Sequence, residues 1–300
     1  MDKTFDRILE SVKSERRVRR VVVAGSHFDH AMEAIVLGIK DKLVTPIFCG
    51  EEKKTIELLE QYGGGDAKYT LYPCDTKEEA AMRAIRCILD GEADFIMKGQ
   101  MDTSDIMGPA LKRENGLRTE ASIVNALGFA EIETHHKMLA MTDGSICVAP
   151  DVSQKRWMIQ NSVDAMRKMG WECPYVACLA AIEKVNPKIQ ATVDGAELQK
   201  MNEEGLISGC IVEGPMAFDC AIDRSASEIK GIKSRIAGEA DLLLFPDLQA
   251  ANIGIKIIIG TGRNKVGTAV LGLKVPIVMS SRGASVGTKF RSLLVAASMC

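Results

Sequence analysis

The chain has 300 residues, of which 46% are hydrophobic and 26% are charged, and its formal net charge at neutral pH is −2. That length allows one large domain or two smaller ones that share a cleft, and we expect two. Aromatic residues make up only 5% of the chain and there is no broad cationic run, so the composition argues against a nucleic-acid-binding protein.

The sequence also argues against a membrane or metal-binding protein. Residues 1–7 contain no apolar signal-peptide core, and no apolar run is long enough to span a bilayer, so we expect a cytoplasmic protein with no membrane partner. The nine cysteines contain no Cys-x-x-Cys pair and lie in apolar segments, as buried thiols do in a reducing compartment. The four histidines show no zinc-binding spacing, and we expect no metal site.

Apolar strand-like runs alternate with helical patterns along the whole chain. Strands are expected at residues 21–25, 46–50, 69–72, 94–97, 137–141, 175–180, 209–212, 240–245 and 276–279, with a hairpin from 137–141 onto 146–148. Helices are expected at residues 5–13, 31–43, 53–62, 77–90, 106–111, 151–168 and 192–203 and from Asn252 onward, and residues 266–271 fit either state. This alternation predicts an α/β fold with a buried, mainly parallel sheet.

A polar turn follows the expected strand at residues 94–97. Ligands gather at the carboxyl ends of strands in open α/β sheets, so Lys98, Gly99, Thr103 and Ser104 are candidate binding residues by position. The alternative is that Thr103 or Ser104 caps the next helix and that Lys98 is solvated.

A second polar turn follows the strand at residues 276–279. Ser281 and Arg282 precede the start of a helix, where free backbone N–H groups and the guanidinium suit a phosphate or a carboxylate. The alternative is a surface loop in which Ser285 caps the helix. If the two turns share one site, the C-terminal segment folds back and makes the first domain discontinuous.

Short motifs occur along nearly the whole chain. They are Met97-Lys98-Gly99 with Thr103, Gly116-Leu117-Arg118-Thr119, His136-Lys137-x-Leu139, Thr142-Asp143-Gly144, Ala149-Pro150-Asp151, Val185-Asn186-Pro187-Lys188, Glu213-Gly214-Pro215 with Asp219, Ala240-Asp241-x-Leu243 with Pro246-Asp247, and Ser281-Arg282-x-x-Ser285. Together these motifs resemble those of the phosphate acetyl/butyryltransferase family. Lys98, Asn186-Pro187-Lys188 and Thr288-Lys289 look more like the butyryltransferase branch than the acetyltransferase branch.

The resemblance implies two α/β/α domains with an interdomain cleft, as in isopropylmalate dehydrogenases. The corresponding boundaries are residues 1–119 with 269–300, which carry the Ser-Arg turn, and residues 120–268. It also implies a homodimer or higher homo-oligomer that exchanges a short-chain acyl group, either butyryl or branched or else acetyl, between coenzyme A and inorganic phosphate. No metal, nicotinamide or covalent acyl-enzyme is implied, so no cofactor is bound permanently and the coenzyme A ester is a substrate.

The resemblance further implies roles for individual residues. Ser281 hydrogen-bonds the reacting thiol or oxyanion and Arg282 holds the phosphate, while Asp219 is the carboxylate we favour as a base. Asp143 is also a common kind of turn former. The residues expected to bind substrate are Lys98, Gly99, Thr103, Ser104, Arg118, Asp143, Pro215, Asp247, Ser285 and Thr288.

Two positions depart from the family pattern. The acetyltransferase branch has an aspartate at the position of Thr288, and family members usually have an arginine at the position of Gly108. Asp219, Asp247 or another carboxylate, or simply positive surroundings, must then activate the thiol. Lys98, Arg113 or Arg118 are the candidates to replace the missing cation.

These departures leave two alternatives to an active acyltransferase. One is a catalytically weak or inactive protein that binds acyl-CoA on the same fold. The other is a dehydrogenase of the related fold, although the sequence lacks the cluster of aspartates on one helix and the nucleotide loop that this activity needs.

Overall fold

The computed structural model describes residues 3–121, 123–281 and 283–300. The chain forms two compact units. The first unit consists of Phe5–Glu120 and Val266–Cys300, and the second unit consists of Ala121–Lys265 with the start of the chain through Thr4. Each unit has helices packed on a sheet, which confirms the α/β fold expected from the sequence.

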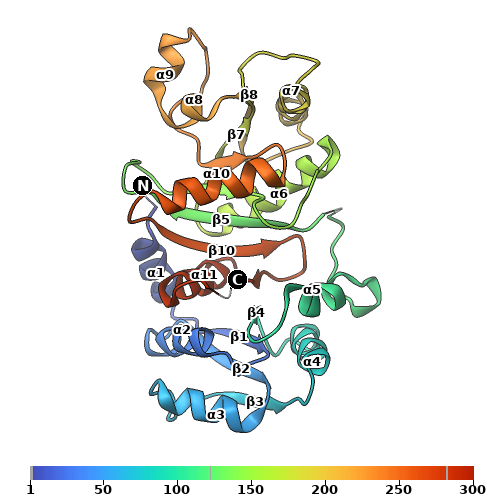
Figure 1. The fold of residues 1–300 in the computed structure, drawn as a ribbon, viewed down its shortest axis with the longest axis vertical. Coiled ribbons are helices and arrows are strands. Elements are labelled where there is room, and N and C mark those ends of the chain that lie inside the picture. Colours follow the sequence, from blue (N-terminus) through green and yellow to red (C-terminus); the bar gives the residue numbers. More distant parts are fainter. Residues whose placement is uncertain (1–2, 122, 282) are drawn as a thin grey trace. The chain divides into compact units, whose positions relative to one another are not determined.

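The sheet of the first unit is mostly parallel. Its strands are ordered β3 (Thr70–Pro73), β2 (Val44–Gly50), β1 (Arg19–Ala24), β4 (Phe95–Lys98), β11 (Ile277–Val278) and β10 (Lys265–Leu271). Only the β10–β11 pair among these is antiparallel. The helices α1 (Phe5–Ser14), α2 (Asp29–Lys40), α3 (Glu52–Gln61) and α11 (Val286–Ser298) lie on one face, and α4 (Lys77–Leu89) and α5 (Thr103–Leu111) lie on the other (Figure 1).

Local sequence explains the central elements of this unit. Val21, Val22 and Val23 are fully buried in β1, because a central parallel strand is covered on both faces. The side chain of Thr76 accepts a hydrogen bond from the backbone N–H of Glu79 and caps α4. A short 3₁₀ helix at Arg113–Asn115 follows α5.

The neighbouring strands β1, β4 and β11 run parallel and end at the same edge of the sheet. Gly25 follows β1, Lys98 and Gly99 stand at the end of β4, and Ser281 follows β11 by three residues. Segments that lie far apart in the sequence therefore meet at this edge, which is where ligands of α/β sheets gather.

The second unit contains five of the strands. Its strands are ordered β5 (Asn125–Glu131), β6 (Leu139–Thr142), β9 (Leu242–Leu244), β7 (Tyr175–Leu179) and β8 (Ile211–Met216), and only the β5–β6 pair among these is antiparallel. Its helices are α6 (Val152–Lys168), α7 (Gln190–Glu203), α8 (Phe218–Ile222), α9 (Arg224–Ile229) and α10 (Leu248–Gly260). Figure 1 shows α7 on one side of β7 and β8, with α8 and α9 on the other.

Four sequence-based expectations differ from the structure or are decided by it. Residues 146–148 form no strand, and β6 instead pairs with β5, which the sequence pattern did not predict. Residues 266–271 are part of the strand β10. Helix α10 begins at Leu248, before the expected Asn252, because Asp247 caps it by accepting the N–H of Ala250.

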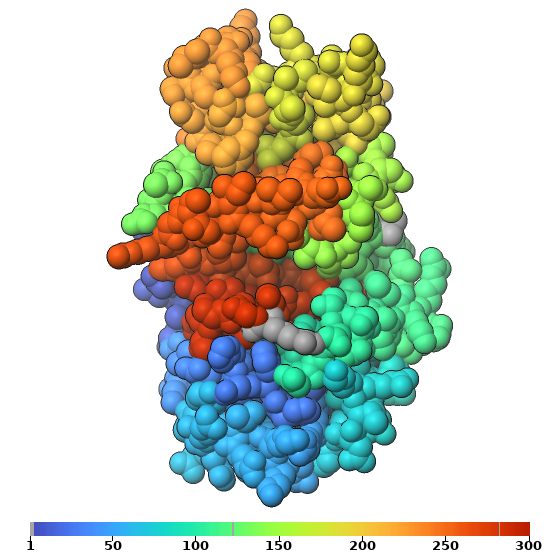
Figure 2. All heavy atoms as spheres, in the orientation of Figure 1, coloured from blue at the N-terminus to red at the C-terminus, as the bar shows by residue number. Residues whose placement is uncertain are grey.

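Helix α10 is strongly apolar but exposes part of its surface. Ile253 and Ile257 are each 59% exposed, and Figure 2 shows this helix (orange) at the surface of the molecule. Within the described ranges, no helix combines the length and apolar character needed to cross a membrane.

Candidate functional site

The turn after β11 carries the Ser281 of the expected anion site. Ser281 is exposed, and its carbonyl accepts a hydrogen bond from the Lys289 ammonium at 2.7 Å. Arg282, the expected phosphate ligand, lies outside the described residues. Ser285 caps α11 by accepting the N–H of Thr288 at 3.2 Å, and the two hydroxyls lie 3.1 Å apart. The capping alternative for Ser285 is therefore correct, whatever else this side chain does.

Two lysines lie beneath this turn. Lys98 is only 8% exposed, so the alternative of a solvated Lys98 is wrong, and its ammonium donates to the Met101 carbonyl at 2.9 Å. Lys289 is 1% exposed, and its ammonium lies 5.3 Å from the centroid of the Phe28 ring. Burial, together with the nearby charge of Lys98, lowers the pKa of Lys289.

Lys289 is not among the site residues expected from the sequence. A signal was present, because positions 289, 293 and 296 recur at helical spacing on the buried face of α11, where Leu293 and Ala296 are apolar. A lysine in such a stripe is unusual, since lysine is rarely buried unless it is paired.

Gly99 is required by the way the turns after β1 and β4 pack. Its N–H donates to the Ala24 carbonyl at 2.8 Å, and the N–H of Gln100 donates to the Gly25 carbonyl at 2.7 Å. A Cβ atom at Gly99 would lie 2.0 Å from the Gly25 carbonyl oxygen. This backbone contact accounts for the glycine, and its part in substrate binding remains a prediction.

Helix α5 presents the other candidates of this turn to solvent. Thr103 and Ser104 are exposed, and neither is the N-cap, which is Asp102; the N–H of Asp102 donates to the Asp105 carboxylate at 2.7 Å. Gly108 lies four residues after Ser104 on the same helix and has open space where a Cβ would be. Arg118 is half-buried and pairs through its backbone with Leu273.

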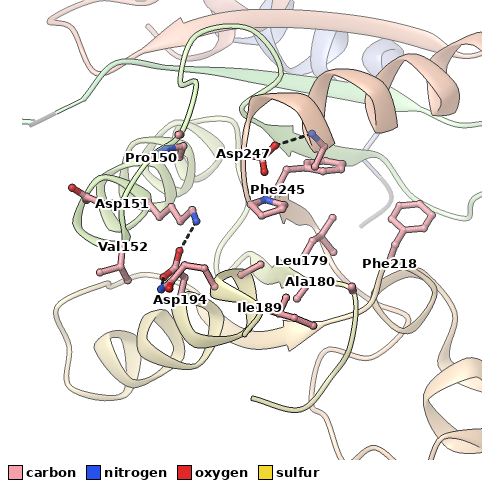
Figure 3. Close-up of a pocket in the computed structure, with 17 residues that line it drawn as sticks. Pro150, Asp151, Val152, Leu179, Ala180, Ile189, Asp194, Phe218, Phe245 and Asp247 are labelled. Carbon is pink, nitrogen blue, oxygen red and sulfur yellow. Dashed lines mark hydrogen bonds and ion pairs between the residues drawn. The ribbon is translucent and has the colours of Figure 1, made fainter. Parts of the chain in front are cut away.

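The second unit contains a cavity of ≈ 870 Å³ with a mainly apolar wall (Figure 3). Leu179, Phe218 and Phe245 line it, and they come from β7, the start of α8 and the segment after β9. The expected substrate-binding residue Asp247 also lines this cavity, next to Pro246.

The starts of α6, α7 and α10 border the cavity. Asp151 caps α6 by accepting the N–H of Gln154 at 2.8 Å, and Asp247 caps α10 by accepting that of Ala250 at 2.9 Å. Helix N-termini favour negatively charged groups, although two of these three already carry a carboxylate. Lys155 and Asp194 form a buried ion pair at 2.5 Å in the same wall (Figure 3).

Asp219, the carboxylate favoured as a base, is paired with a lysine. The Lys230 ammonium lies 2.8 Å from one oxygen of Asp219 and also contacts Glu183 at 2.7 Å. The hydrogen bond from Lys230 holds the pKa of Asp219 below its usual range, which makes this carboxylate a weaker base. Ligand atoms of Glu183, Asp219 and Cys220 lie within 4.8 Å of one another, but Lys230 already supplies positive charge there.

Asp143 and Pro215 take part in internal packing. The Asp143 side chain is buried and accepts four backbone N–H groups, from Ala126 at 2.9 Å and, at 2.7–3.3 Å, from three residues of the following loop (Ser145, Ile146 and Cys147). The backbone N–H groups of Ile146 and Cys147 are therefore bound to Asp143 and do not pair in the hairpin expected at 146–148. Pro215 lies against α7, where a Cβ atom at Gly195 would be 3.0 Å from the Pro215 Cα.

The structure therefore brings some of the expected site residues together and leaves others apart. Within the first unit, the Lys289 ammonium contacts the Ser281 carbonyl and lies near the charge of Lys98, so these three residues lie close together. Within the second unit, Asp247 borders the cavity, whereas Asp219 is bound by Lys230 and Asp143 supports a loop.

Comparisons with known proteins identify relatives over most of the chain. Residues 73–297 match the family model described as phosphate acetyl/butaryl transferase. A phosphate acetyltransferase from Thermotoga maritima is 36% identical over 279 residues, which cover 93% of this chain and 94% of the relative. A phosphate butyryltransferase from Clostridium beijerinckii is 31% identical over 297 residues, which cover 99% and 98% respectively.

A solved structure agrees with the sequence relatives. It is a branched-chain phosphotransacylase from Enterococcus faecalis V583, with a TM-score of 0.83, 25% identity, and coverage of 94% of this chain and 99% of that one. These matches support the acyltransferase and not the alternative of a dehydrogenase of the related fold. The chain belongs to the phosphate acetyl/butyryl transferase family.

Proposed function

We propose that this phosphate acyltransferase exchanges a butyryl or branched short-chain acyl group between coenzyme A and inorganic phosphate. The observation that carries the proposal is the buried positive charge of Lys98 and Lys289 at the Ser281 turn. Both substrates are anions, and a site that binds phosphate must supply fixed positive charge. Relatives named for acetyl and for butyryl transfer match the chain at 36% and 31% identity, so their names alone do not decide the acyl group.

The proposed reaction is a direct acyl transfer. A phosphate oxygen attacks the thioester carbonyl carbon, a tetrahedral oxyanion forms, and the carbon–sulfur bond breaks to release the coenzyme A thiolate. The Ser281 hydroxyl donates a hydrogen bond to the oxyanion, and Arg282 holds the phosphate. A single preorganised donor of this kind is worth about 3–4 kcal/mol of barrier. The scheme uses no metal, nicotinamide or covalent acyl-enzyme.

In the proposed reaction, nearby positive charge lowers the pKa of the coenzyme A thiol. Thr288 is not a base near neutral pH, and the pKa of Asp219 is lowered by Lys230. Nearby ammonium groups lower the pKa of a thiol and stabilise the thiolate as a leaving group. In this scheme Lys98 and Lys289 replace a dedicated carboxylate base.

The cavity of the second unit is the proposed site for an apolar part of the acyl-CoA. Its lining by Leu179, Phe218 and Phe245 suits an aliphatic group, and the burial of each methylene contributes about 0.8 kcal/mol.

Thiol release provides the direct test. Purified protein is incubated with phosphate and acetyl-, propionyl-, butyryl- or isovaleryl-CoA, and free thiol is measured. We expect the highest kcat/KM with butyryl- or isovaleryl-CoA and a loss of roughly 10²–10³ in kcat for Ser281→Ala. Ser14→Ala, at an exposed position on α1, is the matched control. If no ester releases thiol in the presence of phosphate, the proposal is wrong.

A second candidate function is acyl-CoA binding without turnover. It is favoured by Gly108, where the exposed face of α5 carries no side chain. Calorimetry that detects butyryl-CoA binding, together with no thiol release, would select this function.

We further propose a cytoplasmic homodimer or higher homo-oligomer without a resident cofactor. The exposed Ile253 and Ile257 of α10 support self-association, because exposed apolar groups of this kind are often covered by a partner. Light scattering coupled to size-exclusion chromatography measures the mass directly. A monomer at micromolar concentration would contradict the oligomer proposal.

A further inference from the structure

Lys289 is buried without a carboxylate partner. It is 1% exposed, and among the residues that the structure describes its ammonium has one hydrogen-bond acceptor, the Ser281 carbonyl at 2.7 Å, and no ion pair. A buried charge of this kind normally costs stability unless it is paired. Its hydrophobic neighbours Leu293 and Ala296 show that an apolar residue would suit this face of α11.

A second buried cation increases this cost. Lys98 approaches from β4, and its charge acts with burial to lower the pKa of Lys289. The Phe28 ring, 5.3 Å from the Lys289 ammonium, stabilises positive charge only modestly. The buried charge of Lys289, beside that of Lys98, is best explained by a negatively charged group that binds at this turn.

The position of the pair is specific. Both lysines lie at the edge where β1, β4 and β11 end, and Lys289 holds the backbone of the one exposed serine that the proposed chemistry requires. Thr288, next to Lys289, uses its N–H and hydroxyl on Ser285 and adds no charge.

We propose that Lys289 is a positioning residue for acyl transfer: it fixes the Ser281 turn through the Ser281 carbonyl and, with Lys98, creates the positive potential that holds inorganic phosphate at this turn. This inference rests on the proposed function. It assigns a role to a residue that the sequence marks only as similar to the butyryltransferase branch, and it makes Lys98 and Lys289 act as one unit.

Two substitutions separate the parts of this role. Lys289→Met removes both the charge and the donor, whereas Lys289→Gln removes the charge and keeps an N–H donor for the Ser281 carbonyl. Lys13→Met is the control, because Lys13 is an exposed lysine of the same unit that pairs with Asp41. The measurements are the melting temperature, calorimetric binding of inorganic phosphate to the coenzyme A-free protein, and steady-state kinetics with butyryl-CoA.

For Lys289→Met we expect an unchanged or higher melting temperature, because an unpaired buried charge is replaced by an apolar side chain. We expect phosphate affinity to fall about tenfold or more, and the KM for phosphate to rise more than the KM for butyryl-CoA. For Lys289→Gln we expect kcat to recover towards the wild-type value while the KM for phosphate stays raised.

Each possible result of these measurements supports or overturns the proposed role of Lys289. A lower melting temperature for Lys289→Met, with phosphate affinity and kinetics like those of Lys13→Met, would show a purely structural role and overturn the inference. Full recovery of phosphate affinity in Lys289→Gln would overturn the electrostatic part. If the wild type releases no thiol but binds phosphate through Lys289, the proposed function fails and the phosphate site stands. If the wild type is active and Lys289→Met is equally active, the inference alone fails.

Discussion

Asp94 shows how a single side chain holds the start of β4. Its carboxylate accepts the backbone N–H of Arg20 at 2.7 Å and contacts the guanidinium groups of Arg20 at 2.8 Å and Arg17 at 3.2 Å. Burial opposes the charged form, but the hydrogen bonds from Arg20 and the charges of both arginines outweigh it and hold the pKa below its usual range.

Asp94→Asn should therefore destabilise the protein in a pH-dependent way. The folded-state pKa of Asp94 lies below its ordinary value of 3.8, so the stabilisation is complete above that pH and is lost as the pH falls through the folded-state pKa. We expect the variant to lose roughly 1–3 kcal/mol of unfolding free energy at neutral pH. Urea denaturation at neutral pH and at about pH 3 measures the difference. An equal loss at both pH values would contradict this account.

At the scale of elements, two glycines differ in whether the structure has room for a side chain. Gly99 sits between packed turns, where a Cβ would lie 2.0 Å from a backbone oxygen, while Gly108 lies in helix α5 with open space around it. Gly99→Ala should cost about 3 kcal/mol or more, because backbone must move. Gly108→Ala should stabilise by roughly 0.5–1 kcal/mol, because alanine favours helix. Thermal denaturation of both variants checks this, and a stable Gly99→Ala protein would disprove the packing argument.

Two helix caps allow an effect on stability to be distinguished from an effect on substrate binding. Thr76 caps α4, and Asp247 caps α10 at the edge of the cavity. Substitution of either by alanine should cost about 1 kcal/mol, because an N-terminal N–H group loses its acceptor. Only Asp247→Ala should also raise the KM for butyryl-CoA, since the start of α10 forms part of the cavity wall. An unchanged KM would show that the cavity does not bind this substrate.

At the scale of the whole molecule, we expect the two compact units to unfold at different temperatures and not as one two-state system. Lys155→Met leaves Asp194 buried without its partner in the second unit and should cost about 3–5 kcal/mol. Differential scanning calorimetry should resolve two components, of which Lys155→Met lowers one and Asp94→Asn lowers the other. A single two-state transition shifted by both variants would contradict this expectation.

The sequence was sufficient to predict those elements whose pattern lies within their own residues. Val21, Val22 and Val23 form a continuous apolar run that predicts β1, and Thr76 with Glu79 predicts the start of α4. The segment Asn125–Glu131 carries no clear strand pattern, and its strand β5 exists because β6 pairs with it. A strand whose hydrogen bonds come from elsewhere in the chain leaves only a weak trace in its own residues.

For the site, the sequence by itself determined that Lys98 and Ser281 lie at strand ends, because apolar runs stop there, and motif resemblance indicated the family. Tertiary structure alone decided that Lys98 and Lys289 are buried together, that Lys230 weakens Asp219 as a base, and that Asp143 supports a loop. The physical reason is that burial, electrostatic coupling and hydrogen bonding depend on neighbouring groups, and in the lysine pair those groups are separated by 191 positions in the chain (289 − 98).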